Sequence, residues 1–97
     1  MEEKRKIDID LKPEIARGVY STFTVITHSS SEFICDFIQA LPGSPKPEVV
    51  SRIIMSPDHA KRFLKALQDN IEKYESKEGP IVLKSVNSPI LPPTGEA

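Results

Sequence analysis

The sequence predicts an α+β fold, in which a four-stranded antiparallel β-sheet is followed by one C-terminal amphipathic helix packed on one sheet face. Two observations predict it. Up to residue 55, apolar residues alternate with polar ones or form β-branched stretches, and beyond it they recur every three or four positions. We expect a single domain over residues 1–79 and a flexible Pro-rich tail over 80–97.

Alternation and turn residues define the four strands. Residues 7–11 alternate Ile or Leu with Asp, as expected of a strand with one buried face, and Pro13 ends that pattern. Residues 15–18 form a short connection with room for one helical turn. Residues 19–28 and 31–41 are rich in β-branched and aromatic residues around Ser29–Ser30, which predicts a long hairpin.

The fourth strand and the helix follow directly on each other. A loop dense in Pro and Gly precedes the strand Glu48–Met55. Ser56 is then placed to cap a helix, and Pro57 stands where its missing N–H costs nothing. We expect this helix to reach about Tyr74–Ser76, because Gly79 follows. Its apolar residues fall on one stripe: Ala60, Phe63, Leu64, Leu67, Ile71 and Tyr74.

The predicted sheet has two apolar faces. In the third strand Phe33, Cys35 and Phe37 point one way, whereas Ile34 and Ile38 point the other. One helix of about 18 residues spans roughly 27 Å and covers a single face. We therefore expect a homo-oligomer, most simply a two-fold dimer packed sheet on sheet or edge on edge. The alternative is that residues 81–83 fold back as a fifth strand.

Composition narrows the classes of partner. The chain has 13 basic and 14 acidic residues, and therefore lacks the basic excess of a dedicated nucleic-acid binder. No apolar run approaches the roughly 18 residues of a membrane span, and the N-terminus does not resemble a signal peptide. The single Cys35 fits a reducing compartment, so we expect a cytoplasmic location.

Residues that carry chemistry do not form a recognisable motif. His28 stands beside a serine turn, where hydroxyls ordinarily bond to the backbone. His28, Cys35 and His59 lack the spacing of metal ligands, and Cys35 alternates with phenylalanines as a buried hydrophobe does. We expect no catalytic, cofactor-binding or metal-binding residue, and hence no enzyme and no cofactor.

Charge along the helix runs against its macrodipole. Lys61, Arg62 and Lys65 occupy its first half, and four acidic residues occupy its second half. The pairs Asp58–Arg62 and Asp69–Lys73 have the spacing of stabilising ion pairs. We combine the basic residues with the second apolar face into a candidate partner-binding surface: Arg52, Lys61, Arg62, Lys65, Ile34 and Ile38.

Several segments together carry a resemblance: His28–Phe33, Leu41–Gly43, Arg52–Arg62 and Ala66–Ile71. Through them residues 7–79 resemble a family of small bacterial proteins, about 100 residues long, classed as a domain of unknown function. That resemblance implies no activity, cofactor or catalytic residue. The order of elements is also similar to that of the export chaperone SecB, although a second long helix and a strongly acidic surface are missing.

These observations favour a non-enzymatic protein-interaction module that acts as a homo-oligomer. One alternative is a SecB-like chaperone that holds unfolded chains on exposed apolar grooves. A second alternative is a nucleic-acid-binding regulator that uses the basic half of the helix.

Overall fold

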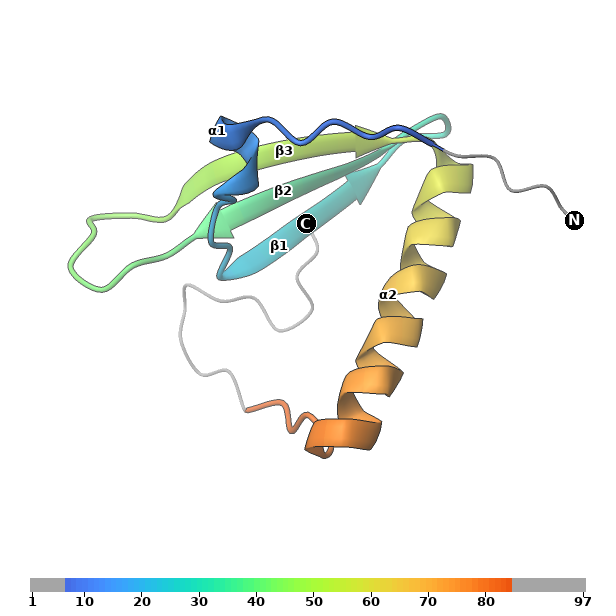
Figure 1. The fold of residues 1–97 in the computed structure, drawn as a ribbon. Coiled ribbons are helices and arrows are strands. Elements are labelled where there is room, and N and C mark those ends of the chain that lie inside the picture. Colours follow the sequence, from blue (N-terminus) through green and yellow to red (C-terminus); the bar gives the residue numbers. More distant parts are fainter. Residues whose placement is uncertain (1–6, 85–97) are drawn as a thin grey trace, which may run out of the picture.

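A three-stranded antiparallel sheet and one long helix make up most of the molecule (Figure 1). The computed structural model describes residues 7–84. Its elements in chain order are α1 (Pro13–Ala16), β1 (Phe23–His28), β2 (Phe33–Gln39), β3 (Glu48–Met55) and α2 (Pro57–Glu78). The strands lie in the order β1-β2-β3, so each pairs with its neighbour in sequence. The predicted α+β class is confirmed, but the prediction of four strands is wrong.

The missing strand is the N-terminal one. Ile7, Ile9 and Leu11 are 75%, 81% and 65% exposed, and their segment pairs with no strand of the described sheet. Alternation predicts an extended backbone with one apolar edge, but a strand also needs a neighbour whose amides are free to pair. The helical turn expected near residue 15 is present as α1, which begins at Pro13.

The hairpin of β1 and β2 is shorter than predicted and has the predicted turn. The amide of Ser29 donates to the carbonyl of Glu32 at 2.9 Å. The Ser29 hydroxyl oxygen accepts from the amides of Ser31 and Glu32 at 3.2 and 3.3 Å. The Ser29 hydroxyl therefore bonds to the backbone of its own turn, as is expected of a serine in a turn.

A β-bulge in β3 changes which residues share a face. Phe37 lies opposite Ser51 and Ile38 lies opposite Val49, so Val50 is the extra residue. Simple alternation would put Val49 on the same face as Ile53 and Met55. The bulge instead puts Val49 beside Ile38, on the other side of the sheet.

Helix α2 begins as predicted and continues further. The Ser56 hydroxyl accepts from the amide of His59 at 3.1 Å, which confirms the cap. The helix ends at Gly79, whose φ of 100° and ψ of 166° belong to a region that only glycine enters freely. At 22 residues it is roughly 33 Å long.

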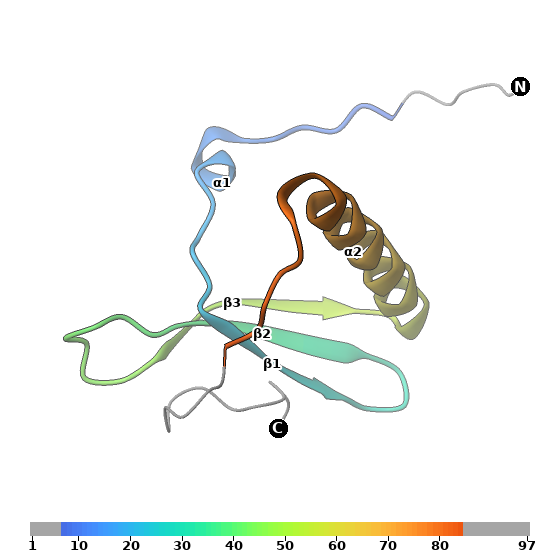
Figure 2. The same cartoon turned by 90° about the horizontal axis from the view of Figure 1, so that it is seen from below.

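The core is small because α2 covers little of the sheet. The helix runs across the direction of the strands and extends beyond the β1 edge (Figure 1). Both helices lie on one side of the sheet (Figure 2), which we call the near face. Cys35 and Met55, at 5% and 8% exposure, are the buried apolar residues of the described chain.

Candidate interaction surfaces

The side of the sheet opposite to the helices, here called the far face, is largely apolar. Within residues 7–84 no helix or strand covers it (Figure 2), and residues 81–83 form no strand. The register puts the following residues on it: Phe23, Val25, Thr27, Ile34, Asp36, Ile38, Val49, Arg52 and Ile54. Val49 and Ile54 are each 54% exposed. Open apolar sheet faces of this kind are typical of surfaces through which proteins associate.

One ion pair lies in the middle of the far face. Asp36 and Arg52 are opposite each other in the register, and Arg52 donates from Nε and Nη2 to the two Asp36 oxygens at 2.6 and 2.8 Å. This hydrogen bonding from Arg52 lowers the pKa of the Asp36 carboxyl and raises the pKa of the Arg52 guanidinium. The far face thus carries opposite charges that are already paired with each other, in a fixed bidentate geometry.

The near face meets the first turns of α2 around a small apolar cavity. Its volume is about 290 Å³, and it is lined by Ile26, Phe33, Cys35, Met55, Ala60, Phe63, Leu64 and Leu67. Desolvation by burial, with a smaller contribution from the charge of Asp36, raises the pKa of the Cys35 thiol. A thiol of raised pKa is a poor nucleophile. Cys35 is therefore a core residue, as its alternation with phenylalanines predicted.

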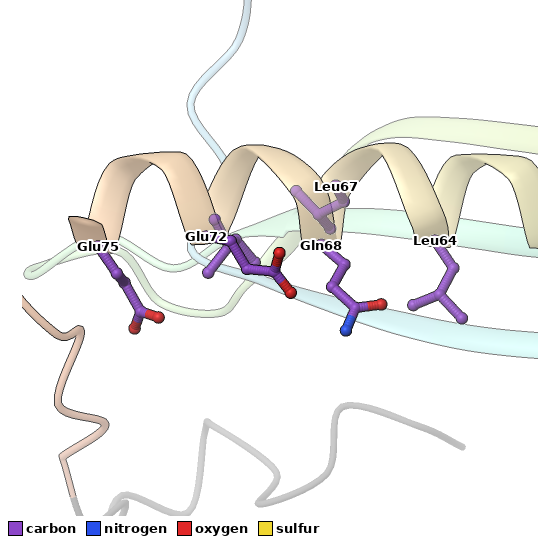
Figure 3. Close-up of a pocket in the computed structure, with 6 residues that line it drawn as sticks. Leu64, Leu67, Gln68, Glu72 and Glu75 are labelled. Carbon is purple, nitrogen blue, oxygen red and sulfur yellow. The ribbon is translucent and has the colours of Figure 1, made fainter. Parts of the chain in front are cut away.

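Beyond this cavity the apolar stripe of α2 leaves the sheet. Phe63, Leu64, Leu67, Ile71 and Tyr74 are between 39% and 58% exposed. An open groove of about 470 Å³ runs along one side of the helix (Figure 3). It is lined by Leu64, Leu67, Gln68, Ile71, Glu72 and Glu75. The stripe expected to pack on the sheet is thus half uncovered in the single chain.

The structure divides the predicted site residues between two surfaces. Ile34, Ile38 and Arg52 lie together on the far face. Lys61 lies on α2 at the flank of its apolar stripe, whereas Arg62 and Lys65 lie further round the helix, away from that stripe. Arg62 forms the predicted ion pair with Asp58, and Lys73 forms the predicted pair with Asp69 at 3.2 Å. The four basic residues therefore do not form one continuous patch.

Sequence reasoning missed the importance of Asp36 and Val49 for the far face. A signal for Asp36 was present, because two consecutive predicted strands carry a carboxylate and an arginine that could pair if those strands were neighbours. Val49 carried no such signal, since its face depends on a bulge that alternation does not reveal.

The histidines serve local structure. The His28 ring stacks on Phe33 with centroids 5.3 Å apart, and His59 lies in the first turn of α2. Among the residues that the structure describes, no three His, Cys, Asp or Glu side chains are grouped so as to hold a metal ion.

The chain matches one known protein family. Residues 1–83 match the family described as protein of unknown function (DUF3467), and the chain belongs to that family. No curated protein and no solved structure matches the chain. None of the helices in the described part is both long enough and apolar enough to cross a membrane.

Proposed function

We propose that the chain is a non-enzymatic protein-interaction module that acts as a homo-oligomer and binds a partner protein on its far face. One observation carries the proposal: an apolar sheet face that no described element covers. Small domains with so little buried apolar surface commonly gain stability from association. The far face also has a specificity element, because a partner must accommodate the Asp36–Arg52 pair.

The positions of the two most reactive kinds of side chain, histidine and cysteine, support a non-enzymatic function. His28 is stacked at the hairpin turn, and Cys35 is buried with a raised thiol pKa. Within residues 7–84, neither side chain is hydrogen-bonded to an acid or a base of the kind that orients a catalytic nucleophile.

The first test is the mass of the chain in solution. Sedimentation equilibrium of the purified chain at micromolar concentrations should give an oligomer, with a dimer as the simplest case. A monomer over the whole concentration range would overturn the homo-oligomer part of the proposal.

The second test asks what lies on the far face. A photo-crosslinking amino acid in place of Ile54 on the far face should give, in cells that express the chain naturally, a discrete adduct with a different protein. The same amino acid in place of Lys46, in the exposed β2–β3 loop, serves as control. Adducts from Ile54 that contain only this chain would show that the far face serves self-association instead.

A chaperone that holds unfolded chains is the second candidate, favoured by the exposed groove and stripe of α2. Such a chaperone should suppress the aggregation of a heat-denatured client at stoichiometric concentration. A client that aggregates at an unchanged rate would exclude this function.

A further inference from the structure

Three polar residues of α2, two of them charged, form a row along one flank of the helix, here called the charged row. Lys61, Gln68 and Glu75 are seven residues apart, and two helical turns bring every seventh residue back to nearly the same side. Gln68, Glu72 and Glu75 extend from the helix on the same side as Leu64 (Figure 3). This flank therefore has a basic end, a neutral centre and an acidic end.

The charged row lies beside the exposed apolar seam. Leu64, Leu67, Ile71 and Tyr74 are separated by three, four and three residues, which is the spacing at which two helices interlock their side chains. Gln68 and Glu75 line the groove together with Leu64, Leu67 and Ile71. A helix seated in this groove would thus meet the apolar seam and the charged row at once.

We propose that α2 packs antiparallel against α2 of a second copy, across a two-fold axis at the level of Gln68. This rests on the homo-oligomer of the proposed function and names the surface that forms it. A two-fold axis places the same flank of each helix against the other, with the directions reversed. Lys61 then lies opposite Glu75 of the second copy, and Glu75 lies opposite its Lys61.

Charge complementarity identifies the second copy as the occupant. Lys61 and Glu75 are each seven residues from Gln68. When a second copy of the row is reversed about Gln68, each lysine therefore comes opposite a glutamate. Lys65 and Glu72 on the neighbouring row stand three and four residues from the same centre. Parallel pairing would instead put Lys61 against Lys61 and Glu75 against Glu75, which like-charge repulsion disfavours.

The same packing explains the reversed charge gradient of α2. Within one helix, basic residues near the N-terminus and acidic residues near the C-terminus oppose the macrodipole. Between antiparallel copies, each basic half adjoins the acidic half of the other helix. Glu75 is also held in place, since its Oε2 accepts from the amide of Ile81 at 2.8 Å.

Charge reversal tests the inference. Lys61→Glu and Glu75→Lys, each alone, place like charges opposite each other twice per dimer, so each should raise the dimer Kd by at least about tenfold in sedimentation equilibrium. The double variant restores opposite charges and should recover the wild-type Kd to within about threefold. Arg62→Glu makes the same charge change on the outer side of α2 and is the matched control.

A cysteine at the axis gives an independent readout. Gln68→Cys should form a disulfide-linked dimer under mild oxidation, whereas Arg62→Cys and the wild type, whose Cys35 is buried, should not. A wild-type dimer that is indifferent to both charge reversals and gives no Gln68→Cys cross-link would overturn the inference while leaving the proposed function intact. A monomeric wild type would overturn both.

Discussion

At the residue scale, Asp36 and Arg52 illustrate how much a side chain depends on its neighbour across the sheet. Each would be an ordinary exposed charge in isolation, and the register makes them a bidentate pair on an apolar face. Because the pair lowers the pKa of Asp36, the free energy of unfolding should rise with pH in the range where Asp36 titrates. Ser56 acts at the same scale, because one hydroxyl satisfies an amide that the helix itself leaves free.

We expect Asp36 to contribute stability that disappears in acid. Its pKa is lowered from 3.8 in the folded chain, so below pH 3.8 the unfolded chain holds more protons and stability rises with pH. The contribution is complete above 3.8 and is lost as the pH falls through the folded pKa. Urea denaturation should show Asp36→Asn to be less stable than wild type at neutral pH. That difference should shrink progressively as the pH falls below 3.8, and a difference that does not change with pH would contradict the assignment.

Ser56→Ala, which removes the cap of α2, should lower the free energy of unfolding by about 1 kcal/mol, because the amide of His59 loses its partner. Ser30→Ala in the exposed hairpin turn is the control and should change stability by less than about 0.5 kcal/mol. Equal effects from the two substitutions would show that the cap does not stabilise α2.

At the element scale, two irregularities decide where elements end and which side they present. The bulge at Val50 rotates the start of β3 and adds Val49 to the far face. Gly79 stops α2 with a backbone conformation that other residues avoid. The sequence predicts the helix end, since Gly followed by Pro commonly ends a helix. It does not predict the bulge.

Gly79→Ala should lower the free energy of unfolding by about 1 kcal/mol, since a Cβ strains the backbone at φ 100° although no atom of the described residues lies within 4 Å of it. Lys77→Ala in the last turn controls for helix propensity. Loss of helical circular dichroism at lower urea in Gly79→Ala than in Lys77→Ala would confirm the strain, and coincident curves would contradict it.

At the scale of the whole molecule, the balance between buried and exposed apolar surface is the main finding. Within residues 7–84, one chain buries Cys35 and Met55, yet leaves the far face and the stripe of α2 open. Association through α2 would cover the stripe and leave the far face for another protein. The two surfaces of the proposal are thus distinct, and each can be disrupted separately.

Self-association should make thermal stability depend on concentration. Because a dimer is favoured by mass action, Tm should rise by roughly a few degrees for each tenfold increase in protein concentration. Differential scanning calorimetry over a wide concentration range would measure this. A Tm that stays constant would mean that the single chain is stable on its own.

The sequence by itself determined the α+β class, strand β3, the cap at Ser56, the ion pairs within α2 and the burial of Cys35. All of these depend on neighbours close in the chain or on simple periodicity. The tertiary structure alone decided that Ile7–Leu11 pairs with no strand of the described sheet, that Val49 joins the far face, and that α2 diverges from the sheet. Each of these depends on contacts between distant segments, and a local pattern carries no information about which distant surface is available to meet it.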